Sequence, residues 1–454
     1  MKVSRIILAL SLMMSIGTSA LAQDSTATMT QPAVWTLKDC IDWAKQQNIT
    51  VQQKRVSARQ AEIDLKDAKN ERLPSVSFST SQQFTNRPFA ETMSVVSGDQ
   101  VVTTSNKNVY SGSYYVGASM PLYDGGVIKN NIKLQEINTQ IAALDIDATE
   151  LSIEESITQV YVQILYSQDQ IKQDKEQIEL IDAQVNRAQE LFKAGLLNKA
   201  DVSQLQSTAA SDRYQLAADE STLANYKLQL KQLLELNGVE SIEIADAALE
   251  EDVLAPLPAV ADVYATAVAS RPEIRARQLY LDQCDLNEKI ARAGTAPNIS
   301  LSASVGTGNT TGNGNMFTQL KDQWSNGVGV TLSIPIWDHH KTSNAVERVR
   351  LDRENTRLEL LNTEKTLWKT IETYWQNATS AQQRYIAAKA NVDACRTSYD
   401  LTSEQFRLGL VNIVELMTDK TDLSTSTHQM LQAKYTALLN AALLKYYNGQ
   451  TISL

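Results

Sequence analysis

Two stretches of the sequence hold residues that could do chemistry. His339 and His340 are two of only three histidines and follow Asp338, and all three side chains are of types that bind zinc. Adjacent residues at a strand-to-helix junction point in different directions and rarely share one ion, so we expect no metal site there. The glycines within 306–314 are typical of a phosphate-binding loop, but no helix with a Lys-Ser or Lys-Thr pair follows them. We interpret this stretch as the tip of a hairpin.

Other residue combinations do not support catalysis. The sequence has no Ser-His-Asp order, no persuasive pair of catalytic acids and no nucleophile motif, so we expect neither an enzyme nor a bound cofactor. Cys40, Cys284 and Cys395 fit neither a disulfide framework nor a metal-binding knuckle, and we interpret them as small buried hydrophobic residues.

The N-terminus predicts export. Two basic residues precede a short apolar run, and Ala20-Leu21-Ala22 has the small-residue pattern at which signal peptidases cut, so we predict a signal peptide over 1–22. Its removal would take the net charge from -10 to -12, because two basic residues are lost. An acidic chain is a poor partner for nucleic acid. The remaining sequence has no apolar run of about 20 residues, so any membrane contact is expected from strands.

The chain contains an internal repeat. Phe192-Lys193-Ala194-Gly195-Leu196 recurs as Phe406-Arg407-Leu408-Gly409-Leu410, and the stretch 120–124 recurs at the same offset as 334–338. We predict a first copy over 23–236, a linker over 237–262 and a second copy over 263–454.

Each copy is predicted to hold a helix, two strands and two long helices. In the first copy the helix covers about 51–72 and the strands lie within about 75–123, separated by a loop over 87–108. In the second copy the strands lie within about 298–337, around a loop over 307–323. Prolines, which lack a backbone N–H and disfavour helix before them, stand at the four helix-strand junctions: Pro74, Pro121, Pro297 and Pro335.

The strands alternate between apolar residues and small or polar residues. Residues 299–305 and 327–336 show the pattern most cleanly, and Tyr123, Trp324 and Trp337 lie at strand ends, where an interfacial aromatic girdle would fall. A soluble sandwich would alternate in the same way, but the export signal and the lack of another partner for the apolar face favour lipid. Four strands cannot close a barrel, and an open edge in hydrocarbon leaves backbone groups unpaired. Two, three or four copies would supply eight, twelve or sixteen strands, and twelve or more can hold an open lumen.

The long helices carry an apolar residue at every seventh position. The expected helices 127–193 and 341–407 are each about 100 Å long at about 1.5 Å per residue. Sustained period seven indicates coiled-coil packing between helices. The repeated positions in the first copy are Ile157, Ile164, Ile171, Ile178, Val185 and Phe192, and the second copy repeats them from Ile371 to Phe406.

The duplication, the two glycine-containing turns and the helix-ending Leu73-Pro74 and Ala296-Pro297 together resemble the TolC family of outer-membrane efflux proteins over nearly the whole mature chain. The resemblance implies a mainly α fold with a membrane β-barrel. In it a homotrimer forms a 12-stranded barrel, with four strands per protomer, which a long periplasmic α-helical barrel continues. It implies an outer-membrane channel, a passive exit duct of a tripartite efflux or type I secretion system that extends into the periplasm. It also implies a periplasmic adaptor protein, an inner-membrane pump and outer-membrane lipid as partners.

The resemblance assigns roles to the two helix-helix turns. By position, Asp201 and Glu415 would be the carboxylates near the narrowest point of the periplasmic entrance, although both also suit the first turn of a helix, where negative charge is favourable. The residues expected to form the turns and contact the adaptor are Phe192, Gly195, Leu196, Phe406, Gly409 and Leu410.

Two other functions remain alternatives. A periplasmic adaptor also has helical hairpins, but it would not contain two apolar-faced strand pairs in a duplicated frame. A coiled-coil surface adhesin would need one long helix per chain and a C-terminal anchor. The exported cargo is not specified by these residues, so drug, metal, lipid and peptide export all stay open.

Overall fold

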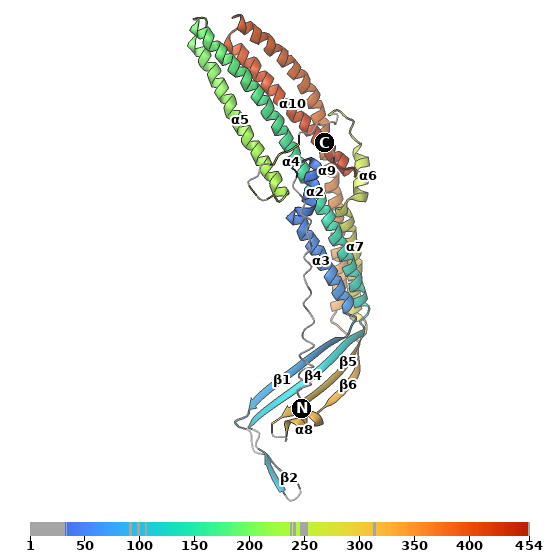
Figure 1. Ribbon diagram of the computed structural model, residues 1–454. Helices are drawn as coiled ribbons and strands as arrows, with labels where there is room; N and C mark the ends of the chain where they lie inside the picture. Colours follow the sequence, from blue (N-terminus) through green and yellow to red (C-terminus); the bar gives the residue numbers. More distant parts are fainter. Residues whose placement is uncertain are drawn as a thin grey trace.

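The computed structural model describes residues 32, 34–89, 93–97, 100–104, 107–236, 238, 242–245, 253–311 and 315–452. The expected signal peptide lies outside these residues. A four-stranded sheet stands at one end of the described chain, and long helices extend from it to the other end (Figure 1).

The two halves build matching series of elements. The first half consists of α2 (Leu37–Gln47), α3 (Ile49–Asn70), β1 (Ser75–Asn86), β2 (Met93–Ser97), β3 (Gln100–Thr104), β4 (Asn108–Tyr123), α4 (Val127–Lys193) and α5 (Lys199–Leu233). The second half consists of α6 (Val260–Ser270), α7 (Pro272–Arg292), the short 3₁₀ turn η1 (Ala293–Thr295), β5 (Asn298–Thr310), α8 (Met316–Asp322), β6 (Ser325–Ser333), α9 (Lys341–Arg407) and α10 (Ile413–Tyr447).

Each half begins with two helices, so the expectation of a single helix before the strands was wrong. Asn48 separates α2 from α3 because its backbone is extended and its side chain caps α3 by accepting a hydrogen bond from the N–H of Thr50. Arg271 is also extended, because Pro272 follows it and opens α7. The helix α6 starts at Val260, inside the expected linker.

The strands β1, β4, β5 and β6 form one antiparallel sheet in the order β1-β4-β5-β6. The expectation of two strands in the first copy was wrong, because β2 and β3 pair as a separate two-stranded sheet inside the expected loop 87–108. The two halves meet in the pair of β4 and β5, which are central, while β1 and β6 are the edges. The strand β6 ends at Ser333 rather than near Trp337, because Pro335 has no N–H for a further ladder bond. The expected loop 307–323 is shorter than predicted, since β5 continues to Thr310 and α8 fills part of the remainder.

The apolar side chains of the outer strands are exposed, so no part of the chain that the structure describes covers them. Val76 and Phe78 in β1, and Val328, Val330 and Leu332 in β6, are all exposed. None of the described helices combines the length and apolar character needed to cross a bilayer.

The long helices pack in two levels. The helices α4 and α9 are both 67 residues long, with the bounds expected from the sequence. Nearer the sheet α3, α4, α7 and α9 pack side by side, and farther away the order becomes α5, α4, α10 and α9 (Figure 1). The period-seven positions supply the contacts, since Ile157, Ile164, Ile171, Ile371, Ala378 and Val392 are buried. The prediction of coiled-coil packing is confirmed by this burial.

The cysteine prediction was only partly right. Cys40 is buried in α2, and this burial raises the pKa of its thiol to about 12. Cys284 and Cys395 are half-buried instead: the sulfur of Cys284 lies 3.6 Å from the hydroxyl of Thr356 in α9, and Cys395 packs at the margin of a buried cluster.

Candidate functional site

The end of the molecule farthest from the sheet consists of two helix-helix turns with the same backbone (Figure 1). Gly195 follows α4 with φ +76°, and Gly409 follows α9 with φ +73°. Only glycine adopts this left-handed conformation without strain, which is why both turns need it. The same two bonds close each turn: Leu196 N to Leu191 O (2.9 Å) and Gly195 N to Phe192 O (2.9 Å), then Leu410 N to Gln405 O (3.0 Å) and Gly409 N to Phe406 O (3.0 Å).

An asparagine begins the returning helix after each turn. The side-chain oxygen of Asn198 accepts a hydrogen bond from the N–H of Asp201 at 2.9 Å, and Asn412 accepts one from the N–H of Glu415 at 3.0 Å. Asp201 and Glu415 therefore hold the same capping position in their helices, where a carboxylate interacts well with the helix dipole. Sequence reasoning missed the two asparagines, although an asparagine three residues before an acidic residue is a recognisable helix start.

Apolar side chains stand exposed on both turns. Leu196 is 75% exposed and Leu410 is 72% exposed, and Phe192 is 44% exposed. Phe406 differs, because it is half-buried against the cluster that joins the two helical hairpins. The structure thus brings the six predicted turn residues to the same end of the molecule, and three of them, Phe192, Leu196 and Leu410, form an exposed apolar tip.

The two hairpins are held together just below the turns. Val202 and Leu205 of α5 pack against Val392 of α9 and Leu416 of α10 in a buried cluster. Gln184 donates a hydrogen bond to the hydroxyl of Tyr399 at 2.6 Å, and burial raises the pKa of this tyrosine. The buried ammonium of Lys420 forms an ion pair with Asp212 from the other hairpin.

A groove of about 480 Å³ lies between the first turns of α5 and α10. Asp201 lines it together with Asp422, whereas Glu415 is exposed and does not line it. The structure therefore separates the two carboxylates that were predicted to act alike. Asp422 was missed by sequence reasoning, because its counterpart in the first copy is Thr208 and the repeat gives no signal there.

A second polar cluster lies farther along the hairpins. The imidazole of His428 in α10 lies 3.1 Å from the carboxylate of Asp174 in α4. Burial raises the pKa of Asp219 in α5, and the charge of Asp174 adds to the rise, while a hydrogen bond from Gln215 opposes it. Burial also raises the pKa of Tyr166, which faces the same carboxylates.

The histidine pair lies where the backbone turns sharply between β6 and α9, and both residues have left-handed conformations. His339 and His340 have φ +56° and +61°, and they stand where the first copy has Gly125 and Gly126, at +71° and +87°. Across the described parts of the chain, no three histidine, cysteine or acidic side chains are grouped so that they could hold a metal ion.

The family model for outer membrane efflux proteins matches residues 41–235 and 242–450. The alkaline protease secretion protein AprF of Pseudomonas aeruginosa is 24% identical over 299 residues, which cover 64% of this chain and 60% of AprF. The outer membrane protein TolC of Salmonella enteritidis is 21% identical over 300 residues, covering 64% of this chain and 59% of TolC. The chain thus spans little more than half the length of these curated relatives.

The fold is also similar to solved structures. A crystal structure of CusC, described in terms of its folding and transmembrane channel formation, has a TM-score of 0.77 at 16% identity, covering 93% of this chain and 96% of CusC. This likeness shows a common fold, with four strands and long helices in each chain.

Proposed function

The chain belongs to the outer membrane efflux protein family, whose members are outer-membrane conduits and not enzymes, and from this membership we propose that it is the exit duct of a tripartite efflux or type I secretion system. Three copies would close one twelve-stranded barrel in the outer membrane. Their helices would continue the barrel as a tunnel through the periplasm. The name of AprF refers to protease secretion, so we include protein export beside efflux.

The observation that carries this proposal is the open sheet. Its edges β1 and β6 have no partner strand among the described residues, and the apolar side chains of these two strands are exposed. In a bilayer each unpaired backbone group costs several kcal/mol, so the sheet requires neighbouring chains. The edges would pair β6 of one chain with β1 of the next.

A cysteine pair tests this closure. Val76 in β1 and Val328 in β6 lie on the same face of the sheet and at opposite edges, and the register Val76–Ala118–Ala303–Val328 sets them three strand spacings or about 14 Å apart, which no disulfide can bridge within one chain. With the three native cysteines replaced, we expect V76C/V328C and neighbouring pairs on the same face to give disulfide-linked dimers and trimers on oxidation in intact membranes. Each single-cysteine variant is the matched control. Monomer alone across the whole panel, or crosslinks that stop at dimer, would contradict the trimer.

We propose that the two turns form the periplasmic mouth. Threefold symmetry would multiply Asp201 and Glu415 into rings of carboxylates, and such rings in a narrow pore attract cations. Neutralising both, as D201N/E415Q, should lower the cation preference in planar-bilayer recordings at low salt while the trimer stays intact. Because Asp201 shares its groove with Asp422 and Glu415 does not line it, D201N alone should have the larger effect. An unchanged selectivity would make both residues simple helix caps.

The apolar tip is proposed as the contact for a periplasmic adaptor. Leu196 and Leu410 are exposed at the tips of both hairpins, where burial against a partner would stabilise a complex. L196S/L410S should therefore reduce copurification of the adaptor after crosslinking in cells. L180S, at an exposed leucine away from the turns, is the control. Equal recovery with all three proteins would place the contact elsewhere.

A further inference from the structure

A group of unpaired cations stands where the helices meet the sheet. The residues come from the segment just after α3, the first eight residues of α4 and α9, and the last turn of α7. All are exposed, and none forms an ion pair with a described carboxylate. We call them the junction cations: Arg72, Lys129, Lys133, Lys289, Lys341 and Arg348.

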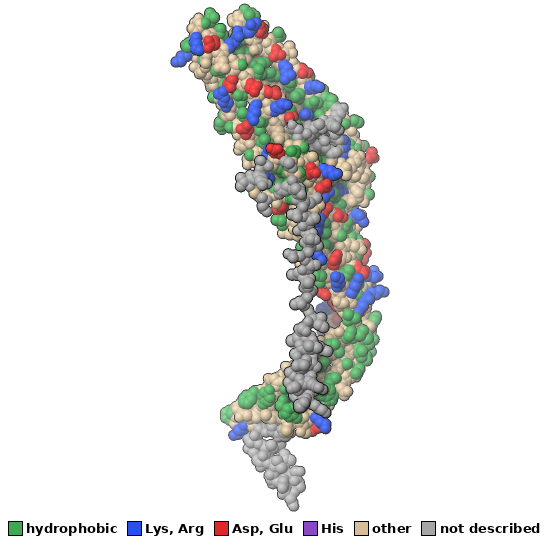
Figure 2. All heavy atoms as spheres, viewed as in Figure 1, with side chains coloured by type: hydrophobic (Ala, Val, Ile, Leu, Met, Phe, Trp, Pro, Cys, Tyr) green, Lys and Arg blue, Asp and Glu red, His purple; other side chains and the backbone are tan. Residues whose placement is uncertain are grey.

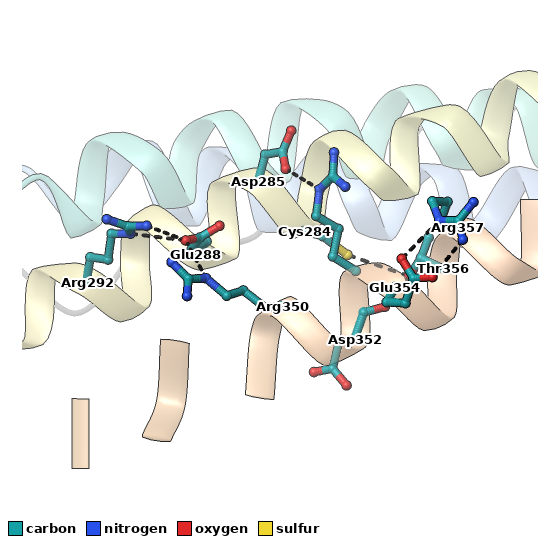
Figure 3. Close-up of polar contacts among 10 residues, drawn as sticks. Cys284, Asp285, Glu288, Arg292, Arg350, Asp352, Glu354, Thr356 and Arg357 are labelled. Atoms are coloured by element: carbon teal, nitrogen blue, oxygen red, sulfur yellow. Dashed lines mark hydrogen bonds and ion pairs between the residues drawn. The ribbon is translucent and has the colours of Figure 1, made fainter. Parts of the chain in front are cut away.

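Other arginines of α7 and α9 in the same region behave differently. Figure 3 shows Arg292 and Arg350 converging on Glu288, at 2.5 and 3.3 Å. Arg353 donates to Asp285 at 2.8 Å. Hydrogen bonds from Arg292 and Arg350 hold the pKa of Glu288 below its ordinary value. The arginines at the contact between α7 and α9 are therefore paired with carboxylates of α7. The junction cations form a separate set that has no such ion pairs.

The junction is also cationic in total. The segments 69–73, 124–133, 286–295 and 337–348 hold eight basic and five acidic residues, in a chain whose net charge is -10. Two of those acids are occupied as helix caps, since Asp124 accepts from the N–H of Ile128 at 2.6 Å and Asp338 accepts from the N–H of Thr342 at 2.8 Å. The junction therefore carries net positive charge, although the whole protein is negatively charged.

Exposed apolar and aromatic side chains lie at the same level. Leu73 directly follows Arg72, and Tyr123, Ile336 and Trp337 are exposed just before α4 and α9. Figure 2 shows Lys and Arg side chains gathered at the edge of the molecule where the helices meet the hydrophobic side chains of the sheet. Aromatic rings beside long basic side chains are typical of the headgroup layer of a membrane, where the stems lie in apolar surroundings and the charges reach phosphates.

We propose that the junction cations bind the phosphate groups of anionic phospholipids in the leaflet that faces the periplasm. This inference rests on the proposed function, because it needs the sheet to lie in the outer membrane with the helices below it. The occupant is a lipid and not a protein partner, because the cations border the exposed apolar band and a lipid satisfies both surfaces at once. Three chains would arrange eighteen such charges around the barrel. A basic residue near an anionic membrane surface contributes about 1 kcal/mol, or roughly a fivefold preference.

The test compares the unmodified trimer with two fourfold variants. All three are placed in nanodiscs that contain mostly phosphatidylethanolamine and a minor share of phosphatidylglycerol. After gentle delipidation, native mass spectrometry counts the lipids that remain bound. We expect phosphatidylglycerol to be enriched about fivefold or more over its share in the nanodisc. K129Q/K133Q/K289Q/K341Q should lose most of this enrichment. The matched control K172Q/K365Q/K369Q/K389Q removes the same charge from exposed, unpaired lysines along the helices, and should keep it.

Trimer yield and single-channel conductance are measured on the same preparations. Loss of the trimer in the unmodified protein would overturn the proposed function itself. An intact conducting trimer that shows no enrichment, or equal enrichment in both fourfold variants, would overturn only the lipid site. Displacement of the bound lipid by millimolar glycerol phosphate would also overturn it, because the cations would then select free phosphate without the acyl chains.

Discussion

The helices α5 and α10 hold the same place in the two copies of the repeat but have different surroundings. Both are 35 residues long and follow the same kind of turn, yet α10 buries 17 of its residues and α5 buries four. The cause is position, since α10 lies between α4 and α9, whereas α5 packs along α4 at the edge of the helical layer (Figure 1). The two copies therefore share the same local structure, but the elements that pack against α5 and α10 differ.

Matched positions make the difference concrete. Leu228 of α5 is 64% exposed, and its counterpart Ala442 of α10 is 1% exposed. Tyr214 of α5 is exposed, and its counterpart His428 contacts Asp174. The helical layer thus has an open face at α5, in the same way that the sheet has open edges at β1 and β6. In the proposed trimer both openings would be covered by the next chain.

The largest expected effect comes from truncating α10 rather than α5. Leu438 is 3% exposed, so L438A should destabilise the protomer by about 2–5 kcal/mol through lost contacts and a residual cavity. L228A on α5 should leave the isolated protomer within about 0.5 kcal/mol of the unmodified protein. It should instead shift the trimer toward monomer. Thermal unfolding and analytical ultracentrifugation at one protein concentration separate the two effects, and equal behaviour of the variants would remove the distinction between α5 and α10.

The next largest effect lies at the corners before α4 and α9. A side chain at Gly125 would meet the Cβ of Ala296 at 2.5 Å and would also be held at positive φ. G125H, which introduces the residue of the second copy, should therefore cost about 2–4 kcal/mol from left-handed strain and overpacking.

The reverse exchange is the control for that corner. His339 already tolerates φ +56°, so H339G relieves strain while making the unfolded chain more flexible. We expect a change of at most about 1 kcal/mol, in either direction. Thermal midpoints of the two variants, measured in the same detergent, should differ clearly. Similar losses in both would mean that the corners are equivalent after all.

The sequence predicted the parts of this fold that depend on local chemistry. The bounds of α4 and α9 followed from the left-handed glycine turns at one end and the proline junctions at the other. The helix α2 before Asn48 was missed, because an apolar pattern over only 11 residues has a weak signal. The different burial of α5 and α10 was not predictable, since both carry the same period-seven pattern and the difference arises only when the hairpins pack.

In the candidate site, too, the local backbone was predictable from sequence motifs, whereas features that depend on helix packing were not. Gly195 and Gly409 were placed at the turns by their motifs, and the backbone bears this out. That Asp201 lines a groove and Glu415 does not depends on how α5 and α10 approach each other, which a repeat of sequence cannot show. The roles of these carboxylates at the entrance remain predictions.

A smaller effect should be equal in both copies. Asn198 and Asn412 make the same capping bond within their own helices and need no neighbour to do so. N198A and N412A should each cost about 1 kcal/mol, the usual value for losing such a cap. Hydrogen exchange of the first turns of α5 and α10 would show faster exchange in the matching variant only. Unequal losses would mean that the caps, like the outer faces of these helices, depend on packing.

The smallest expected effect concerns the polar cluster around Asp219, which has no counterpart in the second copy of the repeat. Asp219 faces Asp174 and Tyr166 of α4 and His428 of α10, and its counterpart in the second copy is Ala433. Because burial raises the pKa of Asp219 above its ordinary 3.8, the protonated acid is favoured in the folded state. Its contribution to stability is fully present below about pH 3.8 and is lost as pH rises through the higher folded pKa.

D219N removes that loss, so it should raise the thermal midpoint at pH 7 and have little effect near pH 4. The gain should be below about 1 kcal/mol, since the carboxyl is partly solvated. A433N, at the matched position of α10, is the control and should show no such pH dependence. If D219N gave the same shift at both pH values, the titration of Asp219 would not be the cause, and α5 and α10 would differ in packing alone.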